Sequence, residues 1–205
     1  MSLRKLAILG ASGHGKVVAD AAELSGWDEV VFFDDAWPEC SSNSVWPVLG
    51  TTADLLASLE QFAGVAIAIG NNVIRYEKLQ QLREHGAVLP AIIHPQAVIS
   101  RYAHIGEGSV ICAGVVVNAD AQIGAAAILN TGCSVDHDCV LADAVHISPG
   151  ARLAGGVRVG QCSWIGMGAV VRQLLTVGAY SVVGAGAAVV KNIGDHATVK
   201  GVPAQ

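Results

Sequence analysis

An aliphatic residue recurs every six residues through the second half of this chain. Starting at Ile93 and stepping by six, every position up to Val189 holds Ile, Leu or Val, which makes 17 consecutive matches. The residue four positions after each of these is mostly small or aliphatic as well, so two positions of each hexapeptide are predicted to face inward. A period of six fits neither an α-helix nor a long flat strand, but it fits short strands separated by regular turns. Residues 93–192 are therefore predicted to form a parallel β-helix of hexapeptide repeats.

The composition agrees with a repetitive backbone that carries small side chains. Glycine accounts for 24 of 205 residues, whereas aromatic residues make up only 5 %. The formal net charge of −5 argues against nucleic-acid binding, because nucleic-acid-binding proteins gather Lys and Arg to displace counterions from phosphates. Residues 173–190 form an uncharged run near the minimum length for a membrane span, but they keep the register of the repeat and are assigned to the β-helix.

The cysteines and the N-terminus favour a reducing compartment. Five cysteines without a CxxC motif indicate neither a disulfide framework nor a thiolate zinc site. Arg4 and Lys5 lead directly into a short apolar segment, without the longer apolar region and cleavage site of a secretory signal. The protein is therefore expected in the cytoplasm.

Residues 1–92 alternate between predicted strands and predicted helices. The strands are expected at 5–9, 30–33, 65–69 and 88–92, and the helices at 16–24, 53–59 and 74–84. This order predicts a small parallel, Rossmann-like α/β sheet. Of the 29 charged residues, 17 lie in this segment, so the composition changes where the repeat starts. Three parts are predicted: an α/β domain (1–92), a β-helix (93–192) and a C-terminal tail (193–205).

A glycine-rich turn spans residues 10–16, between the first predicted strand and the first predicted helix. It contains GxxxxGK, but Val17 stands where a phosphate loop needs a metal-binding Ser or Thr, so nucleotide hydrolysis is not expected. As a dinucleotide fingerprint it reads GxxGxG, and Asp34 and Asp35 follow at a strand end, where a ribose hydroxyl could be held. In both interpretations, amides at the helix N-terminus attract a phosphate. The alternative is a tight turn without a ligand; His14 and Lys16 favour an anion.

Taken together, the motifs and their order resemble the PglD/NeuD-like family of bacterial sugar acetyltransferases. They are GASGHGKVV from Gly10, Asp34-Asp35, Ile69-Gly70-Asn71-Asn72, Ile93-His94-Pro95, Asp136-His137-Asp138-Cys139, His146-Ile147-Ser148-Pro149-Gly150 and Gly201-Val202-Pro203-Ala204. The resemblance covers nearly the whole chain. It implies a left-handed β-helix with three hexapeptides per coil, and acetyl transfer from acetyl-CoA to the 4-amino group of a UDP-linked 4-amino-4,6-dideoxy N-acetyl sugar of the bacillosamine type. It also implies that the lobe binds UDP and that a trimeric β-helix holds CoA.

The resemblance also implies roles for individual residues. His137 falls on the catalytic base, and Asp138 on its neighbouring carboxylate, which is often Glu in the family. His146 falls on the histidine near the acetyl carbonyl. The contacts of the nucleotide sugar fall on Gly13, His14, Asp34 and Asp35, with Asn71 as a weaker candidate.

The residues themselves also point to His137 as a base. It occupies an outward position of the repeat between two aspartates, where a histidine that merely fills the core is not expected. An imidazole with a pKa near 6.5 can take a proton from a sugar amine at neutral pH. Asp138 or Asp136 could orient the ring. The alternative is a solvated surface cluster.

His146 follows His137 at half the length of one coil of three hexapeptides. The two side chains should therefore project from opposite sides of one coil, so a shared site needs a second subunit. This spacing predicts a homotrimer with interfacial sites, in which His146 donates to the thioester oxygen. Gly155, one coil beyond His137, is the candidate for a second, backbone donor. The alternative for His146 is an interface histidine with no chemical role.

Covalent and metal-dependent chemistry are not expected. Cys133 and Cys139 flank His137 but occupy inward positions, where a thiol behaves as a small apolar group. No second imidazole stands one coil away from His137 or His146, so no metal site is predicted. Two other functions remain open: an O-acetyltransferase acting on sialic acid or another sugar, and a non-catalytic trimer that binds nucleotide sugars. A nicotinamide-dependent enzyme is a weaker alternative.

Overall fold

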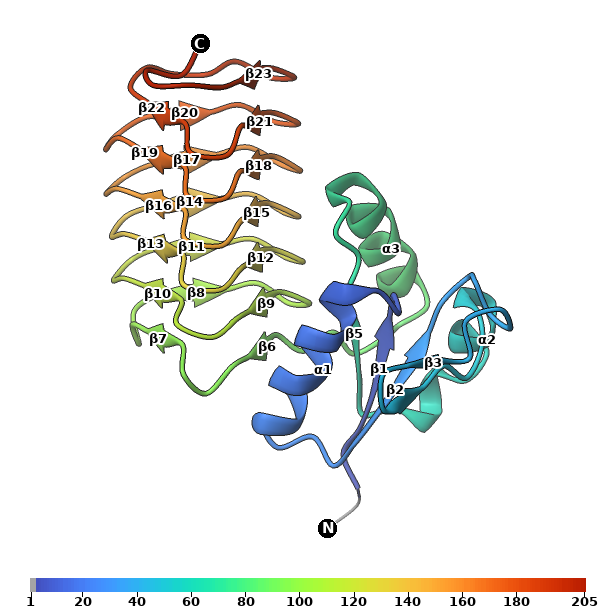
Figure 1. Cartoon of the computed structure of the whole chain (residues 1–205). Coiled ribbons are helices and arrows are strands. Elements are labelled where there is room, and N and C mark those ends of the chain that lie inside the picture. The colour runs from blue at the N-terminus through green and yellow to red at the C-terminus, as the bar shows by residue number, and fades with distance from the viewer. Residues whose placement is uncertain (1–2) are drawn as a thin grey trace.

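The computed structural model describes residues 3–205, which form an N-terminal α/β lobe followed by a β-solenoid (Figure 1). Three strands of the lobe make a parallel sheet in the order β2-β1-β5. The elements of the lobe are β1 (Lys5–Leu9), α1 (Gly13–Leu24), β2 (Glu29–Phe33), β3 (Ser42–Asn43), β4 (Trp46–Pro47), α2 (Thr52–Leu56), a 3-10 turn (Leu59–Gln61), β5 (Gly64–Ile67) and α3 (Asn72–Glu84).

The lobe differs from the sequence-based expectation in four places. Helix α1 begins at Gly13, within the glycine-rich turn, rather than at Lys16. The expected helix at 53–59 is split into α2 and the 3-10 turn, and the β3–β4 hairpin was not predicted. The strand expected at 88–92 does not form, because Pro90 has no N–H to donate to the sheet. The Leu89 carbonyl accepts instead from Gly108 of the solenoid, so the chain leaves the sheet at this point.

The solenoid consists of two-residue strands that follow one another at the predicted interval of six from β6 to β22, with a final interval of ten before β23. They are β6 (Ile92–Ile93), β7 (Val98–Ile99), β8 (His104–Ile105), β9 (Val110–Ile111), β10 (Val116–Val117), β11 (Gln122–Ile123), β12 (Ile128–Leu129), β13 (Ser134–Val135), β14 (Val140–Leu141), β15 (His146–Ile147), β16 (Arg152–Leu153), β17 (Arg158–Val159), β18 (Trp164–Ile165), β19 (Val170–Val171), β20 (Thr176–Val177), β21 (Val182–Val183), β22 (Ala188–Val189) and β23 (Thr198–Val199).

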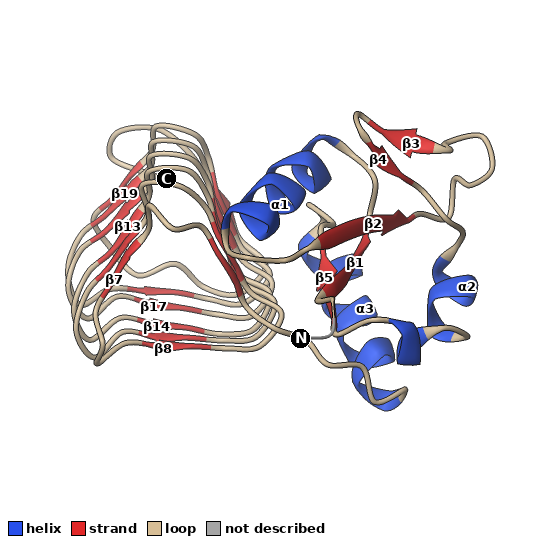
Figure 2. Ribbon diagram, turned by 90° about the horizontal axis from the view of Figure 1, so that it is seen from below, coloured by secondary structure: helices blue, strands red, loops and turns tan. Residues whose placement is uncertain are grey.

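From β6 to β19, each strand pairs in parallel with the strand three places further along the chain, so one coil takes three hexapeptides; at the C-terminal end, β21 pairs with β23. Val117, for example, pairs with Val135, and Ile147 pairs with Ile165. The strands form three flat faces of six, five and seven strands, which enclose a triangular interior (Figure 2). The second residue of nearly every strand is buried in that interior. The predicted β-helix is therefore confirmed.

The turns between the strands share one backbone conformation. From residue 108 to residue 186, every sixth residue, fourteen in all, has a φ between 49° and 69°. This left-handed conformation costs a residue with a Cβ about 1–2 kcal/mol. All five turns on one edge of the solenoid avoid that cost with glycine, from Gly114 to Gly186, whereas the other two edges use Asp, Ala, Cys, Leu or Tyr at most of these positions.

The lobe packs against one face of the solenoid through an apolar contact. Helix α1 lies between the sheet of the lobe and the solenoid (Figure 2). Val18 and Ala22 of this helix belong to the same buried cluster as Ile92 and Val110 of the first coils. Within residues 3–205, no helix is long and apolar enough to cross a membrane.

Candidate active site

His137 lies in the turn that joins β13 to β14, at an edge of the solenoid. Asp136 accepts two hydrogen bonds of 2.8 Å through Oδ1, from the backbone N–H of His137 and from the side-chain amide of Asn118. Nδ1 of His137 lies 2.7 Å from Oδ2 of Asp138. Asp138 has the left-handed φ that closes each turn, at 58°. The backbone conformation required by the repeat thus also places this carboxylate beside the ring.

This geometry leaves Nε2 of His137 available to a substrate. When Nδ1–H donates to the carboxylate, the neutral ring carries its free lone pair on Nε2. The side chain of His137 is 63 % exposed. The hydrogen bond to Asp138 is the main cause that raises the pKa of His137, and the charges of both aspartates add to it. The two aspartates therefore have separate tasks: Asp138 orients the ring, and Asp136 fixes the backbone of the turn.

Gly155 lies one coil beyond His137 and directly against its ring. A Cβ on Gly155 would lie 2.5 Å from Cε1 and 2.6 Å from Nε2 of His137, so only glycine fits beside the ring in this position. The equivalent amides of Ala125 and Ala179 donate to aspartate side chains at 2.8 Å. Within the described part of the chain, the amide of Gly155 has no such acceptor. Gly155 therefore offers a free backbone donor at the edge of the solenoid that carries His137.

His146 lies on β15, on the face that also contacts the lobe. Its ring stacks on Trp164 of the next coil, with a centroid distance of 5.7 Å and an interplanar angle of 9°. Its Nε2 lies 3.4 Å from the side-chain amide of Asn130. Burial, followed by the charges of Arg75 and His14, lowers the pKa of His146 to about 3. The imidazole is therefore neutral at physiological pH and can donate one N–H.

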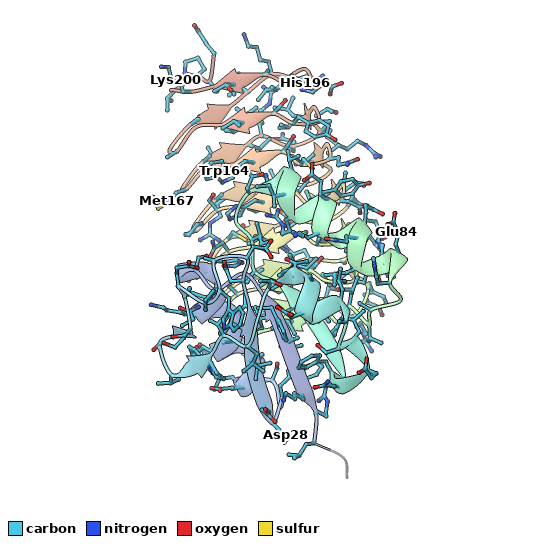
Figure 3. The ribbon with its side chains drawn as sticks, turned by 90° about the vertical axis from the view of Figure 1, so that its right-hand side faces the viewer. Asp28, Glu84, Trp164, Met167, His196 and Lys200 are labelled. Atoms are coloured by element: carbon cyan, nitrogen blue, oxygen red, sulfur yellow. The ribbon has the colours of Figure 1, made fainter. Side chains whose placement is uncertain are left out.

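A largely apolar cavity of about 470 Å³ opens beside His146. It is lined by His146, Ser148, Pro149, Trp164, Gly166, Met167, Val182, Val183, Gly184 and Ala185. Trp164 and Met167 lie on a part of the solenoid that the lobe leaves uncovered (Figure 3). The indole N–H of Trp164 donates to Ser148 Oγ at 2.6 Å, which fixes the ring that forms one wall. The cavity can take a long, flexible, mainly apolar chain.

In the lobe, Gly13 and His14 form the first turn of α1. The cap residue Ser12 makes no side-chain hydrogen bond to the helix, and the first turn carries no acidic residue. Its free amides can therefore donate hydrogen bonds to a phosphate. Nε2 of His14 is buried and has no hydrogen-bond partner among residues 3–205; burial, with the charge of Arg75, lowers the pKa of His14 to about 4.

Asp34 and Asp35 follow β2, as predicted, but both carboxylates already bind the protein. Asp34 accepts from the amide of Ala11 at 2.7 Å and from that of Ala36 at 2.9 Å, so it holds the glycine-rich turn against the end of β2. Asp35 accepts from the amide of Thr52 at 2.8 Å, which is the first cause of its lowered pKa, and pairs with Lys78. Both still line a small cavity at the carboxyl ends of the strands.

Asn71 caps helix α3. Its Oδ1 accepts from the amides of Val73 at 3.0 Å and Ile74 at 3.1 Å. It also lines a cavity of about 240 Å³ between the lobe and the solenoid, together with Trp164 and Tyr180. The side-chain carbonyl of Asn71 is thus occupied in capping α3. The residue nevertheless borders the cavity between the lobe and the solenoid.

The structure brings the predicted residues together in two separate groups. His137, Asp138 and Gly155 share one edge of the solenoid. His146 lies on the face opposite that edge, and the charge of His14 from the lobe contributes to the lowered pKa of His146. In a three-faced coil, the edge between β13 and β14 lies across the interior from the face that holds β15. One chain therefore does not place both histidines at one point.

Sequence reasoning missed Arg75, which is fully buried in the junction between lobe and solenoid. A signal was present: Arg75, Leu79 and Leu82 have the i, i+4, i+7 spacing of one helix face, and the other two are apolar. A charged residue on the helix face that packs against the core indicates that a polar group is buried there to bind it. Trp164 also received no role, although it stacks on His146.

The structure confirms that the cysteines beside His137 belong to the core. Burial raises the pKa of the Cys133 thiol to about 12 and also raises that of Cys139. Across residues 3–205, no group of three or more His, Cys, Asp or Glu side chains could hold a metal ion.

Comparisons with known proteins identify the family. A family model described as the PglD N-terminal domain matches residues 5–82. The acetyltransferase domain of PglB from Neisseria gonorrhoeae, solved in complex with acetyl coenzyme A, is 47 % identical; the match covers 100 % of this chain and 99 % of that one, with a TM-score of 0.95. The chain belongs to the PglD family of sugar acetyltransferases.

Two further members of the family differ in the nucleotide sugar that their names contain. A histidine-to-asparagine variant of perosamine N-acetyltransferase from Caulobacter crescentus, in complex with CoA and GDP-perosamine, is 38 % identical, with 100 % and 97 % coverage and a TM-score of 0.95. UDP-N-acetylbacillosamine N-acetyltransferase from Bacillus subtilis is 38 % identical over 115 residues, which are 54 % of this chain and 52 % of the relative. The match thus spans about half the length of this curated relative.

Proposed function

We propose that this protein transfers the acetyl group of acetyl-CoA to the 4-amino group of a UDP-linked 4-amino-4,6-dideoxy N-acetyl sugar. The observation that carries this proposal is the oriented imidazole of His137, whose Nδ1 is held by Asp138 and whose Nε2 is free. An amine acceptor must be neutral before it can attack a thioester, and this nitrogen is suited to take its proton.

In the proposed mechanism, Nε2 of His137 accepts a proton from the amine while the nitrogen attacks the thioester carbonyl. A C–N bond forms, the C–S bond breaks, and the departing thiolate takes the proton back from the imidazolium. Asp138 stabilises the charged ring through Nδ1–H and does not itself become protonated. The raised pKa of His137 suits an acceptor of protons near neutral pH.

Two neutral donors can stabilise the oxygen of the tetrahedral intermediate. The unpaired amide of Gly155 lies beside the ring of His137. The imidazole of His146 is kept neutral by burial and can supply the second N–H. The apolar cavity beside His146 fits the pantetheine arm of acetyl-CoA. The complex of the related PglB domain with acetyl coenzyme A supports acetyl-CoA as the donor.

The lobe supplies the proposed site for the nucleotide sugar. The uncapped N-terminus of α1 at Gly13 and His14 suits the diphosphate, and the cavity beside Asp34 and Asp35 suits the nucleoside. Asn71 faces the space through which the sugar would reach the solenoid.

The proposed active assembly is a homotrimer with sites between subunits. This arrangement is supported by the placement of His137 on an edge and of His146 on the opposite face of the coil. A neighbouring subunit that brings its edge to this face unites the two histidines.

The test is release of free thiol from acetyl-CoA in the presence of UDP-2-acetamido-4-amino-2,4,6-trideoxyglucose. We expect release with this sugar and none with its 4-hydroxyl analogue. If only hydroxyl acceptors such as sialic acid are acetylated, the protein is an O-acetyltransferase. If acetyl-CoA and the sugar bind without turnover, the catalytic proposal is wrong.

A further inference from the structure

Helix α3 contacts four successive coils of the solenoid, three of them at equivalent positions and the first at the residue before that position. From the end of the helix to its beginning, the contacts are Arg83 Nε to Glu107 Oε1 (2.8 Å), Arg75 Nε to the carbonyl of Ala126 (2.8 Å), Arg75 Nη2 to the carbonyl of Ala144 (2.8 Å), and Asn72 Nδ2 to the carbonyl of Cys162 (3.0 Å). The helix therefore touches one edge of the solenoid coil by coil.

The spacing of the helix matches the spacing of the coils. Ala126, Ala144 and Cys162 occupy the same position of successive coils and share the left-handed turn conformation, with φ of 49°, 54° and 56°. Three coil steps at the distance between neighbouring strands span about 14 Å. The helical segment from Asn72 to Arg83 rises about 16 Å. The helix can therefore contact four coils in order without bending.

Arg75 is the centre of this contact. Its side chain is fully buried and makes five hydrogen bonds, to the carbonyls of Ala126, Ala144, Ile69 and Gly70 and to Oδ1 of Asn72. All of its acceptors within residues 3–205 are uncharged. A buried cation without these hydrogen bonds would be strongly unfavourable. The guanidinium therefore holds three segments in fixed relative positions: residues 69–72 of the lobe, and the turns of the solenoid at Ala126 and Ala144.

The same contact adjoins both histidines of the junction. The carbonyl of Ala144 precedes His146 by two residues in the same coil, and the charge of Arg75 lowers the pKa of both His146 and His14. If the lobe shifted by one coil along the solenoid, the part of the lobe that now lies beside the coil of His146 would lie beside the coil of Ile128 or that of Trp164. These two residues are the strand neighbours of His146.

We propose that α3 sets the height of the lobe on the solenoid, and that Arg75 and Asn72 are positioning residues that keep the lobe in register with the coil of His146. Neither residue is assigned to the reacting atoms. The guanidinium and the amide hold the nucleotide-sugar half of the site in register with the acetyl-CoA half. The inference rests on the proposed acetyl transfer for its activity readout only.

The test compares Arg75→Lys and Asn72→Ala with Arg83→Gln. Arg75→Lys keeps the charge but loses the planar fork. Asn72→Ala removes the side-chain bonds to the carbonyls of Cys162 and Ser163 in the fourth coil, and one acceptor of Arg75. Arg83→Gln is the matched control, because it breaks an exposed lobe-to-solenoid contact of the same helix.

For each variant, kcat, the Kd of UDP, the Kd of acetyl-CoA and the distance between two spin labels are measured. The labels are placed at Asp20→Cys on α1 and Gln122→Cys on β11, in a Cys40→Ser background diluted with unlabelled chains.

We expect Arg75→Lys and Asn72→Ala to lower kcat by about 100-fold, as a misplacement near 1 Å does, and to broaden the label distances. Both Kd values should stay within about twofold, because each half of the site is intact. Arg83→Gln should resemble the wild type. A narrow distance distribution in Asn72→Ala, or parallel losses of UDP binding and kcat, would overturn the inference. If Arg75→Lys does not fold, Asn72→Ala decides. If the wild type acetylates no amino sugar, the proposed function fails, and the distances alone decide the inference.

Discussion

A Cβ on Gly155 would lie 2.5 Å from Cε1 of His137, so these two residues from successive coils fit together only with a glycine at position 155. The ring is held on its other side by Asp138, at 2.7 Å from Nδ1. The orientation of the imidazole thus depends both on the lack of a side chain at Gly155 and on the carboxylate of Asp138.

Gly155→Ala should therefore lower kcat by about 100-fold, because the methyl group displaces the ring from its productive position. The melting temperature should change little, since the ring can rotate into solvent. Gly194→Ala is the matched control, because a Cβ there meets no atom within 4 Å. Equal kcat values for the two variants would contradict the assigned contact.

His137→Ala should lower kcat by about 10²- to 10⁴-fold, the usual contribution of a general base. Thiol release measures the rate, and calorimetry should show unchanged binding of UDP and acetyl-CoA. His104→Ala, another exposed histidine of the solenoid, should retain wild-type activity. Retained turnover in His137→Ala would exclude this residue as the base.

The pH dependence of kcat/KM, which reports the ionisation of the free enzyme, should separate the two aspartates. The pKa of His137 is raised, mainly by Asp138, so the basic form and the rate should increase through an apparent pKa above 6.5. Asp138→Asn should move this limb to lower pH and also lower the plateau, because an amide can hold the wrong tautomer. Asp136→Asn should give the smaller shift. A pH profile unchanged by Asp138→Asn would contradict the orienting role.

Mixed oligomers should test the interfacial site. If each site takes His137 from one subunit and His146 from its neighbour, His137→Ala and His146→Ala chains assembled in equal amounts form intact sites at about one quarter of the interfaces. Refolding the two inactive variants together should then restore about 25 % of wild-type activity. Sites confined to single chains would stay inactive in every mixture.

Folding should become less favourable below pH 6.5 because of the two buried histidines. The folded-state pKa values of His14 and His146 are lowered to about 4 and about 3, so the unfolded chain binds more protons as the pH falls from 6.5. Two such groups reduce the free energy of unfolding by up to about 2.7 kcal/mol per pH unit between pH 6 and pH 4. Denaturant titrations at several pH values measure this slope.

The matched variants for the pH dependence of folding are His14→Gln with His146→Gln, which should flatten the slope, and His104→Gln, which should not. A slope of wild-type size in the double variant would show that the two rings are accessible to protons in the folded state.

The periodic part of the fold was predictable to the residue, because each strand of the solenoid repeats one local pattern. The aliphatic residue at every sixth position is the second residue of a two-residue strand throughout, from Ile93 to Val189. The lobe was less predictable, since its boundaries depend on tertiary contacts. The expected strand at 88–92 does not form because Pro90 cannot donate to the sheet, and Leu89 pairs instead with Gly108, a long-range contact that no local pattern encodes.

The same distinction applies to the candidate site. The placement of Gly155 beside His137 followed from counting three hexapeptides per coil, and the structure brings the two together. Which of the two aspartates contacts the ring could not be predicted, since Asp136 and Asp138 both adjoin His137 in the sequence. The structure shows that Asp138 contacts the ring and that Asp136 accepts from the backbone N–H of His137. Arg75 was missed because most of its acceptors are backbone carbonyls, which every residue has, so no residue type in the sequence marks them as its partners.

The unbroken series of left-handed turn residues from 108 to 186 limits how the length of this chain can change. An insertion of one residue would rotate every later side chain from the interior to the surface, so the solenoid can only gain or lose whole coils of three hexapeptides. A coil added after β18 would leave the four docking positions of α3 untouched. A coil inserted between Glu107 and Cys162 would separate those positions by one strand spacing. The free end of the solenoid can therefore vary in evolution, whereas the docked segment is fixed in length by the helix beside it.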